Sequence, residues 1–311
     1  MTKRKTAGRL LQFIIVLFGI SFLTFCLIYL APGDPVKAMY AANGSVPSEE
    51  VLKAMREKMG LNDPFLMQYF NWLFNCLHGD FGTSYSLNKP VVTVLLQRLW
   101  PTLKLTLFSM ILMLAVSVPF GVISAVKRNK AADYIIRVFS FAGISLPGFW
   151  LGVMLIYIVA LKLKLLPVIS NDTGIKKLIL PAVTLAFSMA AKYTRQVRAA
   201  VLEELHKDYV VGARTRGIKE STVYWAHVFP NALLPLVTLA GLSLGSLLGG
   251  TAVVEVIFSY PGLGSLAVSA VAARDYPLIQ GYVLWTALIY MSVNLAIDLL
   301  YGILDPRTKE R

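Results

Sequence analysis

Long uncharged apolar stretches dominate this sequence of 311 residues. A helix of roughly 20 apolar residues crosses a bilayer core that is about 30 Å thick. Five stretches reach that length: Leu10–Gly33, Leu105–Val126, Val138–Leu161, Val228–Val254 and Tyr276–Ile297. A sixth, Leu178–Ala191, is shorter, and we expect it to continue as a helix through Lys192, Arg195 and Arg198, whose long side chains would extend to the membrane interface. The sequence therefore predicts an all-α integral membrane protein with six spans.

Composition excludes several other classes of protein. Charged residues make up only 15% of the chain, whereas a soluble domain carries about 25%. This argues against a soluble enzyme, a disordered tail and a nucleic-acid-binding module, although 30 Lys and Arg outnumber 17 Asp and Glu. Cys26 and Cys76 are too few for a disulfide framework. The first apolar stretch is longer than the core of a cleavable signal peptide, so we interpret it as a retained span.

The basic residues predict the orientation in the membrane. They gather at the N-terminus, in 127–137, in 192–226 and in the C-terminal tail, and six spans place all four segments on one side. That side is cytoplasmic by the positive-inside rule, although the expected external loop carries Lys162, Lys164, Lys176 and Lys177. The expected order is a cytoplasmic N-terminus (1–9), span 10–33, an external helical region (34–100), spans 101–126, 135–161 and 178–200, a cytoplasmic loop (201–229), spans 230–254 and 276–301, and a cytoplasmic tail (302–311).

The external region 34–100 has the pattern of ordered helices. Ser48 precedes two glutamates, and serine caps the free N–H groups of a helix start where acidic residues are also favoured. Gly60 is a plausible helix end. An aromatic stretch from Phe65 to Leu77 follows. It either lies at the membrane interface as an amphipathic helix or packs onto the helix bundle.

The loop between the fourth and fifth spans, from Glu203 to Pro230, is long and mixed in charge. We expect a helix from about Glu203 to Thr215, a turn at Gly217 and a second helix that leads into Pro230. Two short helices joined at a glycine suit docking in a groove of a cytosolic protein. The alternative is a solvated connector without a partner.

This loop resembles the EAA loop of ABC importer permeases. Ala213, Gly217 and Pro230 match the general pattern, whereas Val211, Gly212, His227 and Phe229 depart from it. The variant Y-V-x-x-A-R-x-x-G followed by H-x-x-x-N-A, from Tyr209 to Ala232, is closer to the peptide and nickel branch. Further motifs resemble the first permease subunit of that branch: Leu30–Pro35, Gly79–Ser84, Pro101–Leu103, Gly249–Thr251 with Glu255, Tyr260–Gly264, Arg274–Pro277 and Asp305–Arg307.

The resemblance implies a six-helix type I ABC importer permease fold with an external helical insertion between spans 1 and 2. It also implies that the loop helix docks in a cleft of an ATP-binding subunit, whose closure drives alternating access. The residues carried over as ATPase-coupling residues are Asp208, Tyr209, Ala213, Arg214, Arg216, Gly217, His227 and Asn231. The chain has no G-x4-G-K-[S/T] phosphate loop, so we expect a non-catalytic subunit that binds no cofactor, with ATP and Mg used by partner subunits.

The partners implied are a second homologous permease, two cytoplasmic ABC ATPase subunits, an external solute-binding protein and membrane lipid, with no nucleic acid. The expected location is the inner or plasma membrane of a bacterium or archaeon, with several spans and both termini in the cytoplasm. Two cargoes fit the branch: di- or oligopeptides, and nickel or a metal chelate. A stand-alone ion-coupled carrier or channel and an intramembrane enzyme are the other classes of function.

Candidate pathway or gate residues lie near the last two spans. Gly241, Gly245 and Gly249 share one face of a helix, which favours close helix packing or lines a path. Glu255 and Asp298 are the acids nearest the spans, and Asn294 lies one turn before Asp298; each acid is either structural or mechanistic. His78, His206 and His227 have no metal-ligand spacing, so no metal site is expected.

Overall fold

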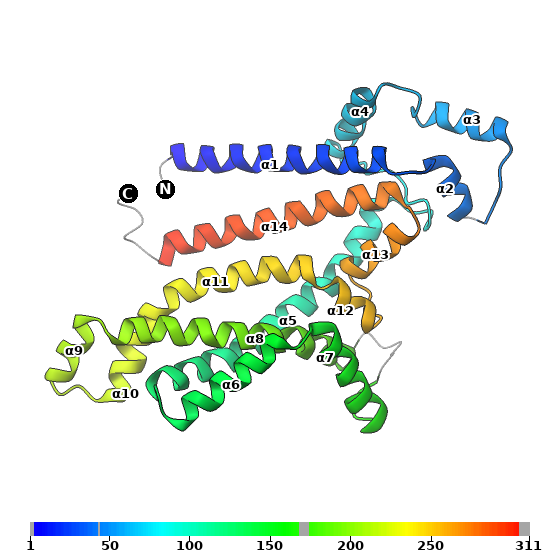
Figure 1. Ribbon diagram of the computed structural model, residues 1–311. Coiled ribbons are helices and arrows are strands. Elements are labelled where there is room, and N and C mark those ends of the chain that lie inside the picture. Colours follow the sequence, from blue (N-terminus) through cyan, green and yellow to red (C-terminus); the bar gives the residue numbers. More distant parts are fainter. Residues whose placement is uncertain (1–2, 43, 168–173, 305–311) are drawn as a thin grey trace. The chain divides into compact units, whose positions relative to one another are not determined.

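The computed structural model describes residues 3–42, 44–167 and 174–304, which are largely helical (Figure 1). The helices are α1 (Lys3–Leu30), α2 (Pro35–Ala42), α3 (Glu49–Lys58), α4 (Phe65–Leu77), α5 (Val91–Val126), α6 (Ala131–Ser145), α7 (Gly148–Leu155), η1 (Ile156–Lys162), α8 (Ile175–Leu205), α9 (Asp208–Thr215), α10 (Glu220–Thr222), η2 (Val223–Val228), α11 (Phe229–Gly250), α12 (Ala252–Ile257), α13 (Leu263–Ala272) and α14 (Tyr276–Leu304). The chain divides into two compact units, one formed by Met1–Thr102 and Pro261–Ser292 and the other by Leu103–Tyr260 and Val293–Arg311.

Among the described residues, three helical stretches are long and apolar enough to cross a membrane unbroken: Leu11–Leu30, Val91–Val126 and Tyr276–Ile297. The number is up to five if each of two bent helix pairs forms one span, Ala131–Ser145 with Gly148–Lys162 and Glu220–Leu233 with Pro235–Gly245. The expected continuation of the short sixth stretch is confirmed, because α8 is one helix of 31 residues, about 46 Å long at 1.5 Å per residue.

Two expected helix boundaries differ from the structure, and a proline is involved in each. The stretch expected as one span over 135–161 is broken at Leu146–Pro147, where α6 and α7 bend by 97°. Proline has no N–H to donate and disfavours helical backbone at the residue before it, and Leu146 is extended. The span expected to begin at 101 begins instead at Val91, because α5 continues through Pro101.

The first residues of α5 belong to the core of the first unit. Val91 and Leu95 are fully buried and belong to one cluster with Leu263 of α13 and Leu278 of α14. Gly281 of α14 lies so close to α5 that a Cβ atom there would be 2.5 Å from Val91 Cγ1. This packing extends the helix ten residues beyond the boundary that the sequence suggested.

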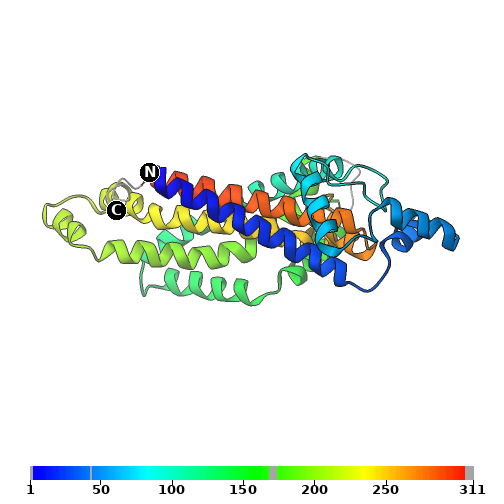
Figure 2. The same cartoon turned by 90° about the horizontal axis from the view of Figure 1, so that it is seen from above.

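The external region contains the expected helices. Ser48 is the N-cap of α3 and accepts from the Val51 N–H, and Gly60, with a φ of +66°, follows its end. Figures 1 and 2 show α2 and α3 beyond the C-terminal end of α1. Of the two interpretations of the aromatic stretch, packing is observed for one face of α4. Tyr69 is fully buried against α1, its hydroxyl lies 2.8 Å from Ser21 Oγ, and the Phe22 and Phe25 rings lie against it.

Asp275 joins two motifs of the first unit that are far apart in the sequence. Its buried carboxylate accepts from Ser84 Oγ at 2.6 Å, from Ser86 Oγ at 2.7 Å and from the Ser86 N–H at 2.9 Å. Its other oxygen accepts from the Leu278 N–H at the start of α14. Hydrogen bonds to Asp275 therefore hold the Gly79–Ser84 and Arg274–Pro277 motifs against each other.

In the second unit, α8 is the central helix. It packs against α5, where a Cβ atom on Gly121 would lie 2.5 Å from Val197 Cβ, and against α6, where one on Gly143 would lie 2.8 Å from Ala191 Cβ. The Tyr193 hydroxyl donates to the Leu236 carbonyl oxygen of α11. The loop between α8 and α11 is therefore attached to a closely packed helix group.

Candidate functional site

The segment from the end of α8 to the start of α11 forms a small protrusion of the second unit, which we call the α9 protrusion (residues 204–231). The structure divides the single helix expected over 203–215, because α8 ends at Leu205 and α9 begins at Asp208. Val210 and Ala213 of α9 are buried with Val223 and Val228 of η2 in the core that contains α5, α8 and α11. The protrusion is thus packed against the helix group.

Gly217 ends α9 in the left-handed region, with a φ of +71°. The Gly217 N–H donates to the Arg214 carbonyl at 2.9 Å, and the Ile218 N–H donates to the Ala213 carbonyl at 3.2 Å. These two bonds form a Schellman motif, which satisfies carbonyls at the helix end. A Cβ atom would meet nothing within 4 Å, so the backbone angle, and not the available space, favours glycine.

Polar contacts fix α9 from both sides. The Tyr209 hydroxyl donates to Glu204 Oε2 at 2.8 Å, and Lys207 pairs with Oε1 of the same carboxylate. Burial, together with the hydrogen bond to Glu204, raises the pKa of Tyr209 to about 12. Beyond the turn, Arg214 forms a bidentate pair with Glu220 at 2.8 and 3.2 Å.

The eight predicted coupling residues lie in this one protrusion but differ in exposure. Those on its surface are Asp208, Tyr209, Arg214, Arg216, Gly217 and Asn231, whereas His227 is half-buried and Ala213 is buried. Arg216 donates to the Gly212 carbonyl at 3.0 Å, and Asn231 donates to the His227 carbonyl at 2.7 Å. Ala213 is therefore part of the buried contact between α9 and the helix group, while the exposed residues form a surface that a partner can reach.

Sequence reasoning missed three residues of the protrusion. Val211 and Trp225 are 54% and 58% exposed and give the protrusion an apolar surface. Glu204 is buried and connects α8 to α9. The sequence signals were an isolated tryptophan in a polar segment and a glutamate five residues before Tyr209.

A second polar group that the sequence did not indicate lies at the turn between α5 and α6. The fully buried Asp133 carboxylate accepts from Arg198 Nε at 2.8 Å, Arg198 Nη2 at 2.9 Å, Ser124 Oγ at 2.5 Å and the Asn129 N–H at 3.0 Å. The expectation that Arg198 extends to the interface is therefore wrong, because an ion pair holds it. Arg195 instead lies over the Phe141 ring, 4.9 Å from its centroid.

The second unit contains a cavity of about 520 Å³ among α7, α8, α11 and α12. Its lining includes Ser188, Lys192 and Gln196 of α8 and Ser243 of α11. The buried Ser188 hydroxyl has no hydrogen-bond partner among the described residues. A polar group in this situation suits a site that takes water or a solute.

The predicted pathway residues whose surroundings the structure describes do not line this cavity. Gly241 packs on α14, where a Cβ atom would lie 2.4 Å from Ile297 Cδ1, so the structure shows it in helix packing. Glu255 is fully buried and accepts from Thr251 Oγ1 at 3.0 Å, so it does not reach water. Gly245 is buried and Asn294 half-buried, and neither lines the cavity. The surroundings of Gly249 and Asp298 lie outside the described part of the structure.

Residues 117–310 match the family described as binding-protein-dependent transport system inner membrane component, and residues 4–106 match the N-terminal part of such a membrane component. The two matches together cover most of the chain.

Three curated relatives align over nearly their whole length. The oligopeptide transport system permease protein AppB of Bacillus subtilis is 41% identical over 309 residues, covering 96% of this chain and 97% of the relative. The nickel import system permease protein NikB of Staphylococcus aureus is 38% identical, covering 97% and 90%. The glutathione transport system permease protein GsiC of Escherichia coli K12 is 38% identical, covering 96% of each chain.

A solved structure shows the same fold. An inward-facing conformation of the MetNI methionine ABC transporter matches with a TM-score of 0.56 and 20% identity, covering 68% of this chain and 96% of the other. The expected type I importer permease fold is therefore confirmed.

Proposed function

The chain belongs to the family of binding-protein-dependent transport system inner membrane components, in the branch of ABC importer permeases for peptides, nickel and glutathione, and we propose that its own cargo is a di- or oligopeptide. The α9 protrusion supports the role in an ATP-driven importer, because it combines the coupling sequence of the branch with an exposed surface on a packed base. The similarity to an oligopeptide permease over nearly the whole chain supports the peptide cargo.

In this proposal the α9 protrusion docks in a cleft of a cytoplasmic ATPase subunit. The exposed surface of Tyr209, Val211 and Trp225 makes the contact. Movement of α9 is transmitted to α8 through the buried Val210 and through the Glu204 carboxylate. The ATPase subunits bind ATP and Mg and perform the hydrolysis, so this chain is a non-catalytic subunit.

The functional unit contains this chain, a second homologous permease, two ATPase subunits and an external solute-binding protein that selects the cargo. Both termini of this chain and the α9 protrusion face the cytoplasm. We assign the 520 Å³ cavity of the second unit to the cargo path, because it offers the Ser188 hydroxyl and the Lys192 side chain to a polar solute. The pathway roles of Asn294 and Asp298 remain predictions.

A nickel or metal-chelate cargo is the second candidate, favoured by the 38% identity to a nickel permease. Uptake of a radiolabelled tripeptide and of radioactive nickel by a deletion strain, with and without the restored gene, distinguishes the two cargoes. We expect the gene to restore peptide uptake. Restoration of nickel uptake alone contradicts the peptide cargo.

The coupling role is tested with Gly217→Asp, which places a side chain and a charge at the turn of the protrusion. We expect loss of uptake and of cargo-stimulated ATP hydrolysis, with normal amounts of protein in the membrane. Normal uptake by this variant contradicts the coupling assignment. Cargo transport by the purified chain without ATPase subunits instead indicates a stand-alone carrier.

A further inference from the structure

The first unit contains its own cavity, of about 620 Å³, at the end of α1. It is lined by residues of α1, α3, α4, the 80–85 segment and the start of α14. Its volume is in the range of small-molecule sites, which is about 300–1,000 Å³. We call it the α1–α14 cavity. It shares no lining residue with the cavity of the second unit that we assigned to the cargo path.

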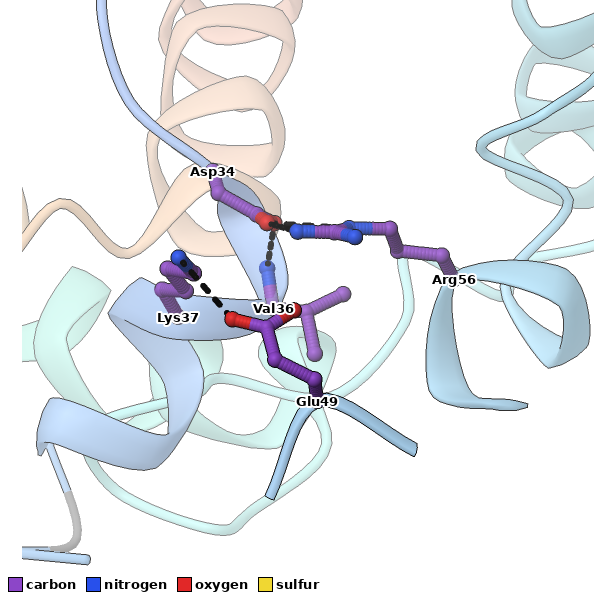
Figure 3. A network of polar contacts seen from close by, with 5 residues as sticks. All are labelled: Asp34, Val36, Lys37, Glu49 and Arg56. Atoms are coloured by element: carbon purple, nitrogen blue, oxygen red, sulfur yellow. Dashed lines mark hydrogen bonds and ion pairs between the residues drawn. The ribbon is translucent and has the colours of Figure 1, made fainter. Parts of the chain in front are cut away.

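Three carboxylates and one guanidinium line the α1–α14 cavity, and the guanidinium is already paired. Arg56 Nε donates to Asp34 Oδ2 at 2.9 Å, and Asp34 also accepts from the Val36 N–H (Figure 3). Asp80 accepts only from the Gly82 N–H, and Asp63 has no hydrogen bond to its carboxylate among the described residues. Asp63 and Asp80 therefore leave the cavity negatively charged, which favours a cationic ligand.

Two buried polar side chains of α14 also line the α1–α14 cavity. Tyr276 and Gln280 are each 8% exposed and lie one helical turn apart. Within the described part of the chain, neither the Tyr276 hydroxyl nor the Gln280 amide has a hydrogen-bond partner. Both side chains are therefore free to hydrogen-bond a ligand in the cavity that they line.

The chemistry of these groups selects the kind of ligand. A glutamine amide has both a donor and an acceptor, which matches the N–H and C=O of a peptide group. The unpaired carboxylates suit an ammonium group, and the Trp72 and Tyr29 rings in the lining suit an apolar or aromatic side chain. An ammonium group, a peptide group and a side chain lie next to one another at the N-terminus of a peptide.

We propose that the α1–α14 cavity is a second peptide-binding site, which takes the free N-terminus of the cargo. This inference rests on the peptide cargo proposed above. Asp63 and Asp80 bind the ammonium group, and Gln280 and Tyr276 bind the first peptide group. The site recognises a free amine, so blocking the amine of the peptide weakens binding there.

The test measures binding of radiolabelled trialanine to the purified full-length chain in nanodiscs of phosphatidylcholine, which has no primary amine. We expect Gln280→Leu to weaken binding about 5-fold to 10-fold and Asp63→Asn with Asp80→Asn to weaken it more than about 10-fold. N-acetyltrialanine should also bind more than about 10-fold more weakly. Tyr290→Phe, on the exposed side of α14, and Glu50→Gln, on α3 outside the cavity, serve as matched controls that leave binding unchanged.

Gln280→Met keeps the size of the side chain without the amide or a new charge, and it replaces Gln280→Leu if the leucine variant does not fold. Trialanine binding that all variants share, or that acetylation does not affect, overturns the proposal. Gln280-dependent binding of O-phosphoethanolamine in place of trialanine also overturns it and assigns the cavity to a lipid headgroup.

Cells that take up trialanine while the purified chain shows no Gln280-dependent binding refute the second site but leave the proposed function intact. Cells that take up only nickel refute the proposed cargo, and the binding measurement still decides the cavity.

Discussion

At the residue scale, Asp133 of α6 joins α5 and α8 through hydrogen bonds with Ser124 and Arg198. Its carboxylate is fully buried and receives four hydrogen bonds, two of them from Arg198. Removing one partner of a buried ion pair leaves the other charge without compensation, at a cost of about 3–5 kcal/mol. We therefore predict that Arg198→Met destabilises the protein by about 3 kcal/mol, measured as a lower unfolding temperature in detergent.

Arg195→Met is the matched control on the same helix. Arg195 lies over the Phe141 ring and is exposed, so its replacement should cost only about 0.5–1 kcal/mol. In Asp133→Asn with Arg198→Met both charges are absent, and this double variant should be more stable than Arg198→Met alone. Equal effects of Arg195→Met and Arg198→Met contradict the structural role of the pair.

Gly217 and Gly212 give a second matched comparison at the residue scale. Gly217 has a φ of +71°, whereas Gly212 is inside α9, and a Cβ atom added at either glycine would meet nothing within 4 Å. Alanine in the left-handed region costs about 1–2 kcal/mol, whereas alanine inside a helix stabilises by about 1 kcal/mol. We predict that Gly217→Ala reduces cargo-stimulated ATP hydrolysis and Gly212→Ala does not. The opposite order contradicts a role for the turn geometry.

At the scale of elements, an ion pair holds α3 against the end of α1. Burial alone would raise the pKa of Asp34, but hydrogen bonds from Arg56 and Val36 and the charge of Arg56 outweigh it and lower the pKa below 3.8. A carboxyl group with a lowered pKa stabilises the folded state above its unfolded pKa, and this contribution is lost as the pH falls through the folded pKa. Attachment of α3 should therefore be constant from pH 7 to 5 and weaken below about pH 4.

A spin label at Lys58→Cys, on the exposed end of α3, reports this change as increased mobility. The control is Asp34→Asn, in which the label should already be mobile at pH 7. A label whose mobility is the same at pH 7 and pH 3 in the otherwise unchanged chain rules out the ion pair as the attachment.

The helix ends show what local sequence can predict. The starts and ends marked by Ser48, Gly60 and Gly217 were correct because capping and a left-handed φ depend on a few neighbouring residues. Pro101 and Pro147 look alike in the sequence, yet α5 continues through the first and the chain bends by 97° at the second. The difference at Pro101 comes from the burial of Val91 and Leu95 against α13 and α14, which no local pattern reveals.

For the molecule as a whole, the class of fold followed from the apolar stretches and the ordered motifs, but the partners of the motifs did not. Ser84 and Asp275 are 191 positions apart, and Asp133 and Arg198 are 65 apart, so no spacing rule connects them. The same holds for the α1–α14 cavity, whose Asp63 and Gln280 come from opposite ends of the sequence. Sequence identifies residues with functional chemistry, and the tertiary fold decides which of them meet.

The orientation of the whole molecule gives the last prediction. The distribution of positive charge predicts that the α9 protrusion lies in the cytoplasm and α3 on the outer side. In a chain with Cys26 and Cys76 replaced by alanine, new cysteines at Glu50 and Val211 provide exposed sites in α3 and α9. A membrane-impermeant maleimide should label Glu50→Cys in intact cells and Val211→Cys only after the membrane is permeabilised. If Cys76 is retained, it should label slowly, because burial raises the pKa of its thiol to about 12 and the thiolate is the reactive form. Labelling of Val211→Cys in intact cells places the protrusion outside, where no cytoplasmic ATPase can reach it, and the coupling mechanism then fails for the molecule as a whole.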